Sequence, residues 1–257
     1  VHTYKNTDRW WSKGHGSLID TPEGKWLVVY HSYENGFYNL GRQTLMEPVE
    51  LTEDGWFKTC DNIDIEKAIP CPIKTQTNDN QYAKLDEFRV GLEWKFYKSY
   101  EPERITVKDK TLTFKSKGTD IRTSPPILFV AGQHAYEVET KIELEGDVTA
   151  GIVLYYNDQF FMGTGFNKVK RVRYRKGEER GSGNHEQPVT NLWLRLRNNA
   201  HIITGAYSYD GVTWHSETWG MDISGYHHNT LYEFQSVLPG LFVCGSRRPS
   251  GLRKTRR

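Results

Sequence analysis

The chain has 257 residues, of which 37% are hydrophobic and 13% aromatic, and its 34 Lys and Arg residues face 32 Asp and Glu residues. At about 150 residues per domain, this length allows one large domain or two ordinary ones. The composition excludes a disordered chain, and no apolar run approaches the roughly 18–20 residues that a membrane-spanning helix needs. We therefore expect a folded protein without a membrane span.

The small excess of positive charge is confined to the end of the chain. Six of the 34 basic residues lie in the last 11 positions, and without them 28 basic residues face 32 acidic ones, a net charge of −4. These six residues are Arg247, Arg248, Arg253, Lys254, Arg256 and Arg257. A mildly acidic body, with no aromatic residue among the cations of the tail, predicts no nucleic-acid partner.

The three cysteines are Cys60, Cys71 and Cys244, and they contain no Cys-x-x-Cys pair, so we expect no zinc site. Cys60 and Cys71 either close one disulfide loop in an exported protein or remain two free thiols. The chain starts at Val1 without an initiator Met and without a signal-peptide pattern. This start predicts that the chain begins inside a longer protein.

Residues 1–60 have the pattern of strands and turns. An aromatic and β-branched run from Trp26 to Tyr33 predicts a strand, the Asn35-Gly36 pair predicts a turn, and Phe37 to Leu45 predicts the returning strand. The segment therefore predicts a small antiparallel sheet of about four strands, which alone has too little core and expects neighbours. Residues 61–85 are polar and interrupted by prolines, which predicts a linker between two domains.

From residue 86 to residue 245, polar and apolar residues alternate with period two, as in strands with one face in water. A continuous apolar run from Gly151 to Tyr156 predicts a buried central strand. Turn signals recur, for example at Asn157-Asp158 and Asp210-Gly211, and no stretch has a helical period. We predict a β-sandwich over residues 86–245, an irregular basic tail over residues 246–257, and an all-β fold class for the whole chain.

Two short stretches are candidates for a functional site. His15 lies between Gly14 and Gly16, which lets other groups approach the imidazole closely; the alternative is a buried turn histidine bonded to the backbone. Arg42 lies in an otherwise apolar strand and needs either an anionic or polyhydroxyl ligand or a structural carboxylate. The pair His227-His228 either binds a metal ion or lies in a solvated turn, and we expect the solvated turn. The pair Glu178-Glu179 is also interpreted as solvated surface.

These residues carry a resemblance to a known family. The segments Gly14–Gly16, Asp20–Trp26, Tyr30–Gly36, Leu40–Val49 and Asp54–Trp56 resemble the last blade of glycoside hydrolase family 43, whose members are five-bladed β-propellers acting on xylosides and arabinosides. Residues 86–245 resemble the concanavalin A-like C-terminal domain of the β-xylosidase-type members. The resemblance implies an incomplete five-bladed propeller, with only its last blade present, followed by a concanavalin A-like β-sandwich.

The resemblance also implies roles for single residues. His15 resembles the histidine at the propeller axis, beside a calcium ion or its waters, and Arg42 resembles the arginine at the floor of the sugar pocket. The implied reaction is inverting hydrolysis of xylosidic or arabinosidic bonds in plant polysaccharide, using three carboxylates on earlier blades. No catalytic residue is therefore assigned in this chain, which we expect to be inactive alone; its expected partner is a xylo- or arabino-oligosaccharide, and export would suit such an enzyme.

The chain departs from the family pattern in two places. Leu51 stands where the family has Trp, and after Gly245 the expected last strand is replaced by Ser, Pro, Arg and Lys residues, which suggests a reading-frame break.

An alternative function is a non-catalytic carbohydrate-binding or structural sandwich, in which aromatic side chains stack on sugar rings or else form the core. The aromatic candidates are Tyr155, Tyr156, Phe160, Phe161, Trp193, Trp214 and Trp219.

Overall fold

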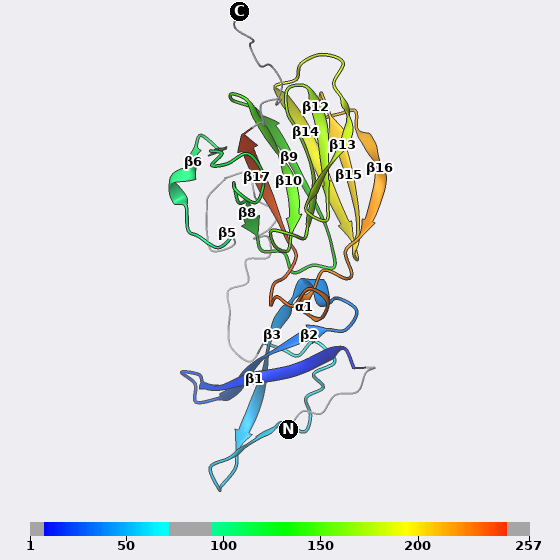
Figure 1. Ribbon diagram of the computed structural model, residues 1–257. Coiled ribbons are helices and arrows are strands. Elements are labelled where there is room, and N and C mark those ends of the chain that lie inside the picture. The colour runs from blue at the N-terminus through cyan, green and yellow to red at the C-terminus, as the bar shows by residue number, and fades with distance from the viewer. Residues whose placement is uncertain (1–7, 72–93, 246–257) are drawn as a thin grey trace, which may run out of the picture. The chain divides into compact units, whose positions relative to one another are not determined.

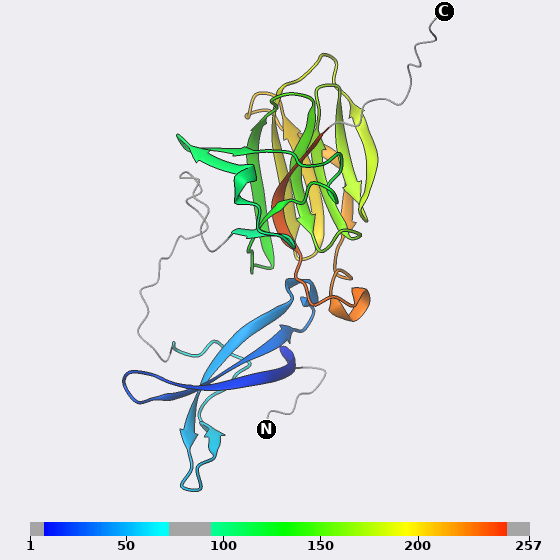
Figure 2. The same ribbon diagram turned by 60° about the vertical axis from the view of Figure 1, so that its left-hand side comes forward.

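The computed structural model describes residues 8–71 and 94–245, which are almost entirely strands and loops (Figures 1 and 2). The chain divides into two compact units. The first contains Val1–Lys84 together with Ile223–Val237, and the second contains Leu85–Asp222 together with Leu238–Arg257. The basic tail, the suggested frame break after Gly245 and residues 72–85 of the linker lie outside the described residues.

The first unit contains one four-stranded antiparallel sheet in the order β1-β2-β3-β4. Its strands are β1 (Trp10–Asp20), β2 (Trp26–Glu34), β3 (Arg42–Leu51) and β4 (Phe57–Thr59). Its small core consists of Val28, Tyr30 and Val49, against which Trp26 and Leu45 pack. The predicted four-stranded sheet is confirmed.

The predicted start of the third strand is wrong. Instead of extending from Phe37, the chain forms a 3₁₀ turn, η1 (Tyr38–Leu40), and β3 begins only at Arg42. Gly41 separates the two with a φ of 74°, a backbone conformation that glycine adopts without strain. A Cβ at this position would also lie 2.9 Å from the Cβ of Ser236, so Gly41 allows residues 223–237 to approach the turn.

Residues 223–237 pack with the four-stranded sheet although they connect two strands of the sandwich. They include a single helical turn, α1 (His228–Leu231), and their last residue, Val237, donates its backbone N–H to the carbonyl oxygen of Asn39 at 2.8 Å. The range predicted for the sandwich, 86–245, includes this segment because nothing in its pattern marks it as separate.

The second unit is a two-sheet sandwich with an added hairpin. The larger sheet has seven strands in the order β13-β12-β11-β10-β17-β8-β5, and the smaller has four in the order β16-β15-β14-β9. The larger sheet contains β5 (Trp94–Phe96), β8 (Ile127–Phe129), β10 (Val148–Tyr155), β11 (Phe161–Phe166), β12 (Lys170–Arg175), β13 (Glu178–Asn184) and β17 (Leu238–Gly245). The smaller contains β9 (Ala135–Glu143), β14 (Asn191–Asn199), β15 (Ile202–Ser208) and β16 (His215–Asp222). The turn η2 (Pro102–Arg104) leads into a hairpin of β6 (Ile105–Lys108) and β7 (Thr111–Phe114).

The core of the sandwich has the properties that the sequence predicts. β10 lies between β11 and β17, and its residues Ile152 to Tyr155 are fully buried, which confirms the predicted central strand. Leu192, Leu194 and Leu196 of β14 are also fully buried. The fold class is thus all-β, as predicted.

The described residues bear on two further points, a membrane-spanning helix and a disulfide. No helix in the described part of the chain is long and apolar enough to cross a membrane. Cys60, Cys71 and Cys244 are all free thiols, so the possible loop between the first two is not closed by a disulfide.

Candidate functional site

The two sequence-predicted site residues lie near each other on the four-stranded sheet, and a third residue, His31, connects them. β1 is irregular where it pairs with β2, because its register shifts on both sides of the pair Gly14 and His31. These irregularities give His15 a φ of 56°, which is uncommon for a residue with a side chain. The exposed imidazole of His15 stacks on that of His31, with 6.0 Å between ring centroids, so the alternative of a buried turn histidine is not observed.

Arg42 begins β3 opposite Tyr33 and is exposed. Its guanidinium carbon lies 4.0 Å from the ring centroid of Phe234 and 5.8 Å from that of Tyr33. Within the described part of the chain Arg42 forms no ion pair, so the alternative of a structural carboxylate partner is not observed. Its planar face is occupied by aromatic rings, and its hydrogen-bond donors remain for a ligand.

Phe234 is a site residue that sequence reasoning missed. It comes from residues 223–237, and the ring of His228 stacks on it with 3.7 Å between centroids. The preceding His227 packs edge-on against Tyr38 at 5.3 Å. His227 and His228 are thus half-buried in aromatic contacts, not solvated surface as expected. One feature of the sequence could have indicated Phe234 as a site residue: it follows a pair of histidines in a region without a strand pattern.

The electrostatics of this cluster favour a neutral His31. Burial lowers the pKa of His31 below its ordinary value of 6.5, and the positive charges of Arg42 and His15 lower this pKa further. The cluster therefore offers one permanent cation beside an imidazole that can donate or accept a hydrogen bond. The described contacts of Arg42, His31 and His15 include no carboxylate, so these groups can bind a polyhydroxyl ligand but cannot supply the acid and base of glycoside hydrolysis.

The side chains around His15 do not by themselves fit a calcium ion. Calcium takes six to eight oxygen ligands, whereas the described side-chain contact of His15 is the imidazole of His31. The described residues also contain no group of three or more His, Cys, Asp or Glu side chains that could hold a metal ion. Calcium beside His15 stays a prediction that requires oxygen ligands from elsewhere.

The aromatic residues considered for sugar stacking in the sandwich divide into two groups. Tyr155, Tyr156 and Phe161 are at most 1% exposed and belong to the core, so they are not available to a ligand. Phe160, Trp193, Trp214 and Trp219 are partly exposed. The guanidinium of Arg195 covers Trp214 at 3.7 Å.

The charged pair Glu178-Glu179 is solvated, as expected from the sequence. Glu178 forms an exposed ion pair with Arg180, and Glu179 forms one with Lys170.

These observations define an all-β chain in which a blade-like sheet with an exposed arginine is followed by a concanavalin A-like sandwich. Residues 1–57 match Glycosyl hydrolases family 43, and residues 83–252 match the Beta xylosidase C-terminal Concanavalin A-like domain. Because the second match alone covers most of the chain, the protein belongs to this glycoside hydrolase family.

Known proteins support the same assignment. The chain is 24% identical to the Escherichia coli (strain K12) protein named "Putative beta-xylosidase", over 79% of this chain and 45% of that protein. The crystal structure of BlXynB from Bacillus licheniformis matches 97% of this chain and 53% of its own, with a TM-score of 0.80 and 21% identity. The xylan beta-1,4-xylosidase of Bacillus halodurans C-125 matches 94% of this chain and 52% of its own, with a TM-score of 0.74 and 16% identity. The chain thus spans about half the length of these relatives.

Proposed function

We propose that the chain is the C-terminal portion of a glycosidase that cleaves xylosidic or arabinosidic bonds of plant polysaccharide, and that Arg42 binds the sugar. The observation that carries this proposal is the environment of Arg42. Its guanidinium lies over the rings of Phe234 and Tyr33 and forms no ion pair in the described residues. It acts on His31, whose lowered pKa favours the neutral imidazole. An arginine placed in this way has donors that no acceptor among residues 8–71 and 94–245 uses, which suits the hydroxyl groups of a sugar.

In this proposal the chain binds and positions, and the proton transfers belong to carboxylates outside it. Inverting hydrolysis requires one carboxylate to activate water and a carboxylic acid to protonate the leaving oxygen, about 6.5–9.5 Å apart. We assign those groups to preceding propeller blades, as in the family resemblance. Arg42 then fixes the sugar ring so that the scissile bond lies between them, and Phe234 excludes water from one side of the guanidinium.

A pair of assays tests the proposal. The 257-residue chain is incubated with aryl β-xyloside and aryl α-arabinofuranoside, and we expect no turnover. The protein extended by the codons that flank this reading frame is then assayed on both substrates, which also identifies the preferred sugar. In the extended protein, Arg42→Ala is expected to lower kcat/KM about a hundredfold, the loss of a charged hydrogen bond worth about 3 kcal/mol.

Arg195→Ala is the matched control. Arg195 is also an arginine that lies over an aromatic ring, but it pairs with Glu137 and Glu139 in the sandwich. We expect this variant to keep the activity. Turnover by the 257-residue chain alone that disappears in Arg42→Ala would overturn the proposal, and so would an extended protein whose activity is unaffected by that substitution.

A further inference from the structure

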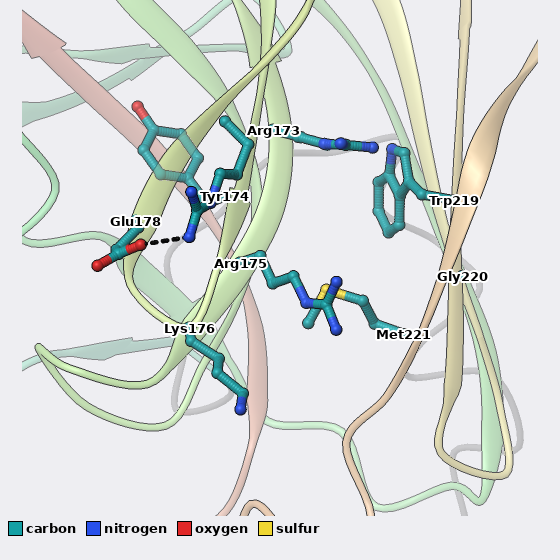
Figure 3. A pocket seen from close by; sticks show the side chains of 9 residues that line it. Arg173, Tyr174, Arg175, Lys176, Glu178, Trp219, Gly220 and Met221 are labelled. Atoms are coloured by element: carbon teal, nitrogen blue, oxygen red, sulfur yellow. Dashed lines mark hydrogen bonds and ion pairs between the residues drawn. The ribbon is translucent and has the colours of Figure 1, made fainter.

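The sandwich contains a cationic pocket at its edge, between β12 and β13 on one side and β16 on the other (Figure 3). Its volume is about 390 Å³, within the range of roughly 300–1,000 Å³ that is typical of small-molecule sites. Arg173, Arg175 and Lys176 line one wall, and Trp219 and Met221 line the other. Figure 3 shows Arg173 and Arg175 directed from β12 toward Trp219 and Met221 of β16.

The arginines occupy positions where a sandwich ordinarily has apolar side chains. Along β12, the buried Val172 and Tyr174 belong to the apolar core cluster, whereas Arg173 and Arg175 alternate with them and face β16. In the neighbouring strand β11, Thr164 lies opposite Arg173 and is 1% exposed. From β11 to β12, this side of the larger sheet therefore changes from the buried Thr164 to the half-buried Arg173 and the exposed Arg175.

The charges in this pocket are not neutralised by the protein. In residues 94–245, Arg173, Arg175 and Lys176 form no ion pair, although the adjacent Arg180 pairs with Glu178 at 2.6 Å. The pocket wall therefore carries three uncompensated positive charges. Arg173 is half-buried, whereas Arg175 and Lys176 are exposed. A half-buried arginine without an anion costs free energy, and a bound carboxylate removes this cost through a bidentate hydrogen bond.

Trp219 adds an aromatic surface to the cationic wall of the pocket. Its indole lies over Gly205, where a Cβ would come within 2.9 Å of the ring, so the glycine makes room for the flat side chain. The indole Nε1 is buried and has no hydrogen-bond partner in the described part of the chain. The indole face, which is partly exposed, suits the C–H face of a sugar ring.

We propose that this edge pocket binds a carboxylate-bearing sugar, that is, a uronic acid unit of a saccharide. Arg173, Arg175 and Lys176 bind the carboxylate, and Trp219 stacks on the sugar ring. The choice of a sugar among anions rests on membership of a glycoside hydrolase family, and the pocket gives the sandwich a saccharide contact that does not involve Arg42.

Isothermal titration calorimetry of the 257-residue chain with methyl glucuronide, methyl glucoside and inorganic phosphate tests the proposal. These two glycosides differ only at C6, which is a carboxylate in the glucuronide and a hydroxymethyl group in the glucoside. We expect methyl glucuronide to bind at least about tenfold more tightly than either other ligand, and added salt to weaken its binding. The double variant Arg173→Gln/Arg175→Gln and the single variant Trp219→Leu are each expected to lower the affinity about tenfold or more.

Arg195→Gln is the control, because Arg195 belongs to the sandwich but is paired with carboxylates, and we expect it to bind like the unchanged chain. If the double variant does not fold, Lys176→Gln replaces it, since this exposed lysine contributes charge without packing. Equal binding of the two glycosides, or phosphate binding that matches methyl glucuronide and ignores Trp219→Leu, would overturn the proposal. Because the assay measures binding alone, its result is independent of whether the proposed hydrolysis occurs.

Discussion

One arginine in each unit shows a contrast: Arg104 of the sandwich and Arg42 of the four-stranded sheet have opposite environments. In the sandwich, Arg104 is only 5% exposed and is fully engaged: it donates to Glu101, to the hydroxyl of Ser124 and to two backbone carbonyls. In the four-stranded sheet, Arg42 is exposed, and its guanidinium lies over the aromatic rings of Phe234 and Tyr33 with no ion pair in the described residues. The polar groups of Arg104 are therefore satisfied within the sandwich, whereas the guanidinium of Arg42 is left for a ligand.

Apolar burial shows the same contrast. The core of the sandwich includes fully buried residues from both sheets, such as Ile152, Leu154 and Leu194. The four-stranded sheet has a small core cluster and leaves large apolar side chains exposed, including Leu18, Ile19 and Trp56. A sheet of this size is marginal without neighbours, and exposed apolar side chains mark where neighbours pack. The contrast teaches that the sandwich has an extensive core of its own, whereas the four-stranded sheet has only a small one.

The largest expected effect tests the self-sufficiency of the sandwich. Phe242 is 2% exposed, and its ring lies where Cβ atoms at Gly151 and Gly165 would come within 2.7 and 2.6 Å. Phe242→Ala leaves a cavity over these glycines, and we expect a loss of about 4 kcal/mol in the free energy of unfolding of the sandwich. Hydrogen exchange of the β10 amides under urea measures this loss.

Trp56→Ala is the counterpart in the sheet. Trp56 is 72% exposed, so this truncation should change stability by less than about 0.5 kcal/mol. Similar losses in the two variants would contradict the contrast between the units.

The second prediction concerns the buried carboxylate of Glu101, which forms ion pairs with Arg104 and Lys117. These three residues are called the ion network below. Hydrogen bonds from Lys117, Ser99 and Arg104 lower the pKa of Glu101 from 4.5 to about 2. The stabilisation from this carboxylate is therefore full above its unfolded pKa of 4.5 and disappears as the pH falls from there toward 2. Glu101→Gln leaves Arg104 buried without its anion, and we expect a cost of about 3 kcal/mol at neutral pH.

The pH dependence distinguishes this mechanism from a general packing defect. In urea unfolding experiments between pH 6 and pH 2, the difference between Glu101→Gln and the unchanged chain should shrink as the pH falls. Glu143→Gln serves as the control, because Glu143 forms an exposed ion pair with Lys141. A difference for Glu101→Gln that stays constant across this range would exclude the ion network as its cause.

Local pattern was sufficient for much of the fold. The run Gly151 to Tyr156 predicted a buried central strand because six apolar residues in succession suit a strand covered on both faces. The same reasoning failed at Phe37 to Leu45, where Gly41 and the approach of Ser236 impose a turn. Here a tertiary contact overrides a strand pattern, and one sequence does not show that contact.

The candidate site was predictable only in part. Arg42 and His15 attracted attention as a cation in an apolar strand and an imidazole between glycines, which are local signals. Phe234 could not be predicted as a site residue, because its role depends on its contact with Arg42, which is far away in the sequence. The arginines of the edge pocket were also hidden: the pattern of β12 predicts one wet face, and only the position of β16 shows that this face lies between the sheets.

The smallest expected effect tests whether the sheet residues form one electrostatic unit. Burial is the largest cause of the lowered pKa of His31, followed by the charge of Arg42 and then that of His15. Removing the charge of Arg42 by Arg42→Gln should therefore raise the pKa of His31 toward 6.5, and His15→Gln should raise it less. NMR titration of the histidine ring protons in the 257-residue chain measures both changes.

The same shift predicts a small effect on stability with a defined sign. Because the folded pKa of His31 lies below 6.5, protonation penalises the fold fully below that folded pKa and not at all above 6.5. The stability of the sheet should thus rise with pH through this window, and Arg42→Gln should flatten the rise while changing stability at neutral pH by less than about 0.5 kcal/mol. Arg195→Gln, in the sandwich, should leave the His31 titration unchanged. If Arg42→Gln also leaves the His31 titration unchanged, the guanidinium of Arg42 does not act on His31. That result would contradict the interpretation of Arg42, His31 and His15 as one electrostatic unit.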